Sequence, residues 1–139
     1  MTPNEMFLQL LENNGFNSCV GERIADDLRE HFHLWEAVLF TGESGIILRD
    51  MAHDKVDYNA DRLYIRTTEE HVGPLMELVS KWNTDSIFVM MSEKTLEFTR
   101  NERDELISKP AVYKESLSSF LGSYSRDPDT RVVFELWWD

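Results

Sequence analysis

Two segments of the chain are apolar at nearly every position, and they constrain the fold more than any other feature. Residues 86–91 read SIFVMM and residues 131–138 read RVVFELWW. Successive side chains of a strand point to opposite faces, so a strand with one solvated face is apolar only at alternate positions. The two faces of the last segment carry Val132, Phe134, Leu136 and Trp138, and Val133, Glu135 and Trp137. We expect residues 86–91 to form a central strand, and the last strand to be either central or covered by a partner.

The first third of the chain has the pattern of two helices. Thr2 is a capping residue, Pro3 suits the first helical position, and Glu5 stands where a capping box places an acid. A second helix is expected near residues 18–31. Its apolar side chains recur every four residues, at Val20, Ile24, Leu28 and Phe32.

The middle and end of the chain mix further strands and helices. Residues 35–41 and 45–51 flank a short turn and predict a β-hairpin, with a second helix continuing through Phe40 as the rival interpretation. Strands are expected at 62–66, 95–99 and 131–138. A helix is expected to end at Trp82 and to begin regularly only at Pro74, and further helices at 102–108, capped by Asn101, and from Pro110 to about Leu121.

This order of elements has no strict alternation of strand and helix. It predicts one α+β domain over residues 1–139, with a mostly antiparallel sheet of five or six strands packed against several helices. The length suits one domain, and no repeat, low-complexity tract or linker divides it.

The charge of the chain is acidic and uneven. The formal net charge is −12, and residues 1–48 hold eight acidic residues against Arg23 and Arg29, a net −6. Lysines and arginines are scattered, whereas a nucleic-acid ligand requires a basic patch, so we expect no direct binding of nucleic acid. On the second helix Glu22, Asp26 and Glu30 share one face. That face is either a plain solvated surface or a docking surface for a basic partner.

The leading functional hypothesis is a small acidic binding protein that occludes or regulates a basic protein. Immunity proteins against nuclease toxins and inhibitors that mimic nucleic acid are proteins of this size and charge. The expected partner-binding residues combine acids with one aromatic anchor: Glu22, Asp26, Asp27, Glu30, Trp35, Glu36 and Glu43.

Two alternatives from other classes stay open. A metal-dependent hydrolase would use His31, His33, Asp50, His53 and Asp54, although their spacing matches no established metal motif. A structural subunit would form a homodimer through the C-terminal strand, whose tryptophans are typical interface anchors.

Catalytic, cofactor and targeting motifs are missing from the sequence. It contains no GxSxG, P-loop or GxGxxG pattern, and Cys19, in an acidic segment, is expected to be a buried or idle thiol. We therefore expect that the protein has no cofactor and that it acts by binding rather than by catalysis. The absence of an apolar run of 18 residues and of a basic leader, together with a single cysteine, predicts a cytoplasmic protein without membrane contact.

Overall fold

The computed structural model describes residues 2–12, 20–42, 60–91, 95–110 and 131–138. Its elements, in chain order, are α1 (Pro3–Glu12), α2 (Gly21–Glu30), the 3₁₀ turn η1 (Phe32–Leu34), β1 (Ala37–Gly42), β2 (Ala60–Thr68), the 3₁₀ turn η2 (Glu69–His71), α4 (Val72–Val79), β3 (Ser86–Met90), β4 (Thr95–Arg100), β5 (Leu106–Pro110) and β6 (Arg131–Trp137).

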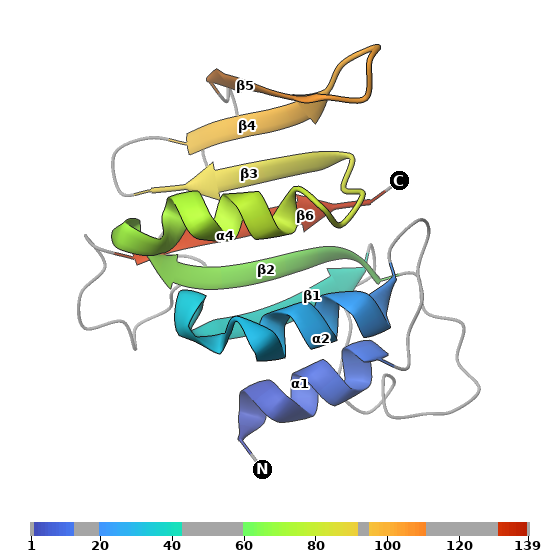
Figure 1. Cartoon of the computed structure of the whole chain (residues 1–139), viewed down its shortest axis with the longest axis vertical. Helices are drawn as coiled ribbons and strands as arrows, with labels where there is room; N and C mark the ends of the chain where they lie inside the picture. The colour runs from blue at the N-terminus through green and yellow to red at the C-terminus, as the bar shows by residue number, and fades with distance from the viewer. Residues whose placement is uncertain (1, 13–19, 43–59, 92–94, 111–130, 139) are drawn as a thin grey trace.

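The strands form one six-stranded sheet in the order β1-β2-β6-β3-β4-β5, and every neighbouring pair is antiparallel. The helices α1, α2 and α4 lie together on one face of this sheet (Figure 1). The expected α+β class with a largely antiparallel sheet is confirmed.

Strands β6 and β3 are the two innermost strands, which confirms the central strand expected at residues 86–91 and gives the last strand the central one of its two expected positions. On the face toward the helices, Phe134 of β6 stands between Ile65 of β2 and Val89 of β3. Leu136 stands in the same way between Leu63 and Ile87, and all these side chains are at most 1% exposed. Full burial of each such side chain contributes about 1.5–3 kcal/mol, so this layer contributes substantially to the stability of the fold.

The other face of β6 is buried as well. Val133 and Met90 are 3% and 1% exposed and form a small apolar cluster with Tyr64. Glu135 is 7% exposed, with the Tyr64 hydroxyl 3.4 Å and the Arg62 guanidinium 3.5 Å from its carboxylate. Burial on both faces explains why this strand does not alternate between apolar and polar residues.

The C-terminal Trp138 belongs to the core. It is fully buried, and its indole N–H donates to the carbonyl of Trp82 at 2.9 Å. Both backbone edges of β6 are hydrogen-bonded to β2 and β3. A homodimer through this strand stays a prediction, and its contacts would have to come from side chains, because the backbone edges are already paired.

The structure differs from the sequence-based expectations at β1 and at α4. The rival interpretation, in which the second helix continues through Phe40, is wrong, because residues 37–42 form the strand β1. In the described part of the chain β1 pairs with β2, and residues 45–51, the other strand of the expected hairpin, lie outside that part. The expected bounds of the next helix are wrong at both ends, because α4 begins at Val72 rather than Pro74 and ends at Val79 rather than Trp82. Pro74 is therefore its third residue. A proline fits there because the first N–H groups of a helix have no acceptor within the helix.

The helix expected at 102–108 is wrong, because the chain reverses there and forms the β4–β5 hairpin. The Asn101 side-chain oxygen accepts hydrogen bonds from the backbone N–H groups of Arg103 and Glu105, both at 2.9 Å. Asp104 has a positive φ of 61°, which ends any helical path. Asparagine caps helices and closes turns with the same side-chain oxygen, so its presence alone did not decide between them. The helix expected beyond Pro110 lies outside the described residues.

Candidate functional site

Helices α1 and α2 pack against each other through one face of each. Leu8 and Leu11 of α1 and Ile24, Ala25 and Leu28 of α2 are buried in the common core. The helix cap expected at Thr2 is present, since its hydroxyl accepts a hydrogen bond from the backbone N–H of Glu5 at 3.2 Å. This packing leaves the opposite face of α2 to solvent.

The solvent face of α2 carries Glu22, Asp26 and Glu30, all exposed. We call these three residues the acidic ridge. They are spaced by four residues, so the ridge runs along the helix for about 12 Å at 1.5 Å per residue. The structure thus brings together the three ridge residues as the sequence pattern predicts.

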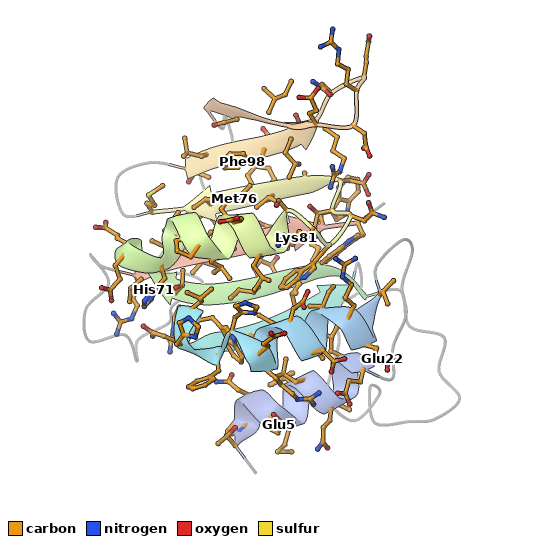
Figure 2. The ribbon with its side chains drawn as sticks, in the orientation of Figure 1. Glu5, Glu22, His71, Met76, Lys81 and Phe98 are labelled. Atoms are coloured by element: carbon orange, nitrogen blue, oxygen red, sulfur yellow. The ribbon has the colours of Figure 1, made fainter. Side chains whose placement is uncertain are left out.

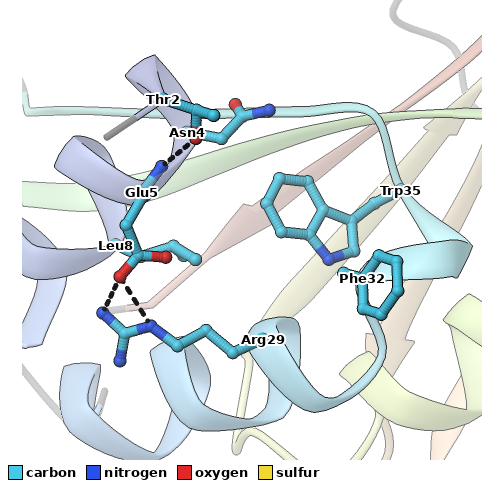
Figure 3. Close-up of a pocket in the computed structure, with 7 residues that line it drawn as sticks. All are labelled: Thr2, Asn4, Glu5, Leu8, Arg29, Phe32 and Trp35. Carbon is cyan, nitrogen blue, oxygen red and sulfur yellow. Dashed lines mark hydrogen bonds and ion pairs between the residues drawn. The ribbon is translucent and has the colours of Figure 1, made fainter.

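Helix α1 extends this acidic surface with Glu5 and Glu12. Figure 2 labels Glu5 on α1 and Glu22 on the neighbouring α2. The Arg29 guanidinium lies between the two helices and is bound to Glu5 at 2.8 Å (Figure 3). It is also bound to Glu12, and Asp26 lies 3.6 Å away. The hydrogen bond that Arg29 donates to the Glu12 carboxylate, followed by the one that it donates to Glu5, raises the pKa of Arg29 above its already high ordinary value. Three carboxylates around one guanidinium leave this cluster with a net negative charge.

The roles of Glu5 and Glu12 were missed by the sequence analysis, which placed neither in the candidate site. They are seven residues apart and therefore on one side of α1. That spacing was a signal that both could face a cation on a neighbouring helix.

Asp27 lies beside the ridge but contacts the protein's own core. Its carboxylate accepts a hydrogen bond from the indole N–H of Trp82 at 2.8 Å, and Arg23 lies 3.9 Å away. Trp82 is only 3% exposed. Asp27 therefore ties α2 to the segment after α4.

Glu36 is also engaged within the molecule. Its carboxylate lies 3.1 Å from Arg131 and 3.4 Å from Arg66, so it joins the residue before β1 to strands β6 and β2. Glu43, the remaining acid of the predicted set, lies outside the described residues. Among the predicted acids that are described, Glu22, Asp26 and Glu30 face solvent, while Asp27 and Glu36 serve internal contacts.

Trp35, the predicted anchor, lines a hollow of about 420 Å³ between the start of α1 and η1 (Figure 3). We call this hollow the α1–η1 groove. The residues that line it are Thr2, Asn4, Glu5, Leu8, Arg29, Phe32 and Trp35. The Trp35 indole N–H donates to the carbonyl of Leu28 at 2.8 Å, which fixes the ring at one side of the groove.

Phe32 was expected to continue the buried row of α2 but is 71% exposed. Helix α2 ends at Glu30, and the following 3₁₀ turn changes the direction of the side chains, so Leu34 is buried instead, at 7% exposed. Val20, the first member of the row, precedes the helix and is 59% exposed. Only the inner two members, Ile24 and Leu28, are buried.

The histidines bear on the alternative metal site. The rings of His31 and His33 lie 6.3 Å apart by their centroids, and Nδ1 of His31 is 3.0 Å from the carbonyl of Asp27. Asp50, His53 and Asp54 lie outside the described residues, as does Cys19. Within the described ranges no group of three potential metal ligands occurs.

Comparison of the chain with models of protein families, with curated proteins and with solved structures gave no match in any of the three. In the part of the chain that the structure describes, no helix has both the length and the apolar character needed to cross a membrane.

Proposed function

We propose that this chain is a small acidic binding protein whose α1–α2 surface docks onto a basic protein and occludes or regulates it. The observation that carries the proposal is the exposure of Glu22, Asp26 and Glu30 along one helix face. Together, the two ten-residue helices hold six acidic residues against two arginines. An inhibitor of the immunity-protein type, or one that mimics nucleic acid, is the finer form of this proposal.

The proposed mechanism is electrostatic steering followed by steric occlusion. A surface of one sign attracts a partner of the opposite sign before contact and raises the association rate, and salt weakens this effect. Arg29 remains charged and holds α1 against α2 through its carboxylate partners, so the acidic groups are presented from a fixed framework. A preformed surface of this kind loses little conformational entropy on binding.

The test is a differential capture experiment with two charge-matched variants. Tagged wild-type protein, a Glu22→Lys/Glu30→Lys variant and a Glu102→Lys/Glu105→Lys variant are incubated with lysate of the source cells at low and moderate salt. Glu102 and Glu105 are exposed in the β4–β5 turn, so the control changes net charge equally without altering the ridge. Mass spectrometry identifies the captured proteins.

We expect the wild type and the control variant to capture one basic protein that the ridge variant does not capture. Moderate salt should weaken the capture of this protein. Equal capture by all three proteins would contradict the proposal. Equal loss in both variants would show that only net charge matters, and would also contradict a specific docking surface.

A further inference from the structure

The α1–η1 groove opens beside the acidic ridge, at the C-terminal end of α2. Phe32 and Trp35 stand at one side of the groove, and Thr2, Asn4 and Glu5 at the start of α1 stand at the other (Figure 3). Arg29 extends between the two sides. Glu30, the last residue of the ridge, is two positions before Phe32. Arg29, which lines the groove, lies 3.6 Å from Asp26 of the ridge, so the groove and the ridge meet at Arg29.

The polar groups that line the groove are already bonded within the protein. Glu5 binds Arg29, and the Trp35 indole N–H donates to Leu28. The Asn4 amide N–H donates to the carbonyl of Glu36 at 2.7 Å, and its oxygen lies 3.4 Å from the backbone N–H of Val38. A polar ligand would have to displace these bonds, which makes the groove a poor site for one.

The aromatic surface of the groove, in contrast, is open. Phe32 is 71% exposed and contacts His33 through an edge-to-face arrangement with centroids 6.1 Å apart. Leu8 and the indole of Trp35 complete the apolar lining. An exposed aromatic ring beside a concave apolar surface is characteristic of a recognition site.

We propose that the α1–η1 groove is an anchor pocket that takes one aromatic side chain from a basic segment of the partner. This inference rests on the proposed function and adds the chemistry of the partner: lysine or arginine residues that meet Glu30 and Asp26, and an aromatic ring that packs between Phe32 and Trp35. Charge complementarity selects a basic segment, and the unfilled aromatic surface selects the apolar anchor. Buried aromatic anchors surrounded by polar contacts carry most of the binding energy in many interfaces.

The two parts of the surface then have different kinetic roles. The ridge charges raise the rate of association, whereas the anchor in the groove slows dissociation. Loss of the anchor would leave a complex that forms rapidly under low salt and dissociates quickly.

The test uses two fluorescein-labelled, lysine-rich synthetic peptides as probes, which differ at one central position, phenylalanine in one and serine in the other. Their affinities are measured by fluorescence anisotropy for the wild type, for Phe32→Ala and for the control Ile107→Ala. Ile107 is 49% exposed on the edge strand β5, so the control also removes an exposed apolar side chain. Thermal unfolding of each variant verifies that it is folded.

We expect the wild type and Ile107→Ala to bind the phenylalanine peptide at least about tenfold more tightly than the serine peptide, and Phe32→Ala to bind both equally. In NMR spectra of the wild type, the phenylalanine peptide should shift the indole N–H signal of Trp35 and the serine peptide should not. The same preference in Phe32→Ala, or no preference in the wild type, would overturn the anchor pocket. If both peptides then bind the wild type in a salt-sensitive way and the Glu22→Lys/Glu30→Lys variant loses this binding, the proposed function stands. If neither peptide binds, both the anchor pocket and the proposed function are overturned.

Discussion

The neighbouring residues Asp26 and Asp27 provide a matched pair, because identical side chains one residue apart have different environments. The Asp26 side chain is 66% exposed, and its described contact is Arg29 at 3.6 Å. The Asp27 carboxylate accepts the indole N–H of Trp82, a residue that is 3% exposed. We therefore predict that Asp27→Ala lowers stability and that Asp26→Ala lowers partner binding.

The size of the stability effect follows from these contacts. Removing the acceptor of a buried N–H costs about 1–3 kcal/mol, so we take about 2 kcal/mol for Asp27→Ala. A domain of this size loses about 4 °C of Tm per kcal/mol, which gives a decrease of about 8 °C. Exposed ion pairs contribute about 0–1 kcal/mol, so Asp26→Ala should change Tm by less than about 4 °C.

Thermal and urea unfolding of both variants, followed by circular dichroism, measures the difference. Asp27→Asn serves as an additional variant, because it keeps a carbonyl oxygen as acceptor and should lose less stability than Asp27→Ala. Equal Tm values for Asp26→Ala and Asp27→Ala, or a larger loss in Asp26→Ala, would refute the stabilising role of the hydrogen bond between Asp27 and Trp82.

Two further substitutions test the fold. Trp138→Ala should lower the free energy of unfolding by about 3–5 kcal/mol, and Trp138→Phe by less, because the ring of Trp138 is fully buried and its N–H donates to the carbonyl of Trp82. Wild-type stability of Trp138→Ala in urea unfolding would show that Trp138 is not part of the core. Asp104→Gly should raise stability by about 0.5–1 kcal/mol, since glycine adopts the φ of 61° at this position without strain and the exposed ion pair that is lost, 3.7 Å from Arg100, contributes little; a lower urea midpoint would contradict this.

The central part of the fold could be predicted from the sequence because its signal is local. A strand that is apolar at successive positions requires cover on both faces, and β3 and β6 are accordingly the innermost strands. The turn at Asn101 could not be predicted in the same way. Its side-chain oxygen fits both a helix cap and a tight turn, and only the pairing of β5 with β4 decides between them.

The candidate site shows the same division between local and distant information. The four-residue spacing of Glu22, Asp26 and Glu30 is enough to place them on one face of a helix. Whether Asp27 faces solvent depends on Trp82, which is 55 residues away in the chain. The exposure of Phe32 depends on where α2 ends, and helix ends are among the least certain features of a sequence pattern.

The most direct test of the proposed docking surface is the association rate constant of the isolated basic partner as a function of salt. It is measured for the wild type, the Glu22→Lys/Glu30→Lys variant and the Glu102→Lys/Glu105→Lys control. Reversal of two ridge charges should slow association and flatten its salt dependence well beyond the effect of the control, because steering depends on where the charges lie. Equal association rates for the ridge variant and the control would contradict the proposal that the α1–α2 surface is where the partner docks.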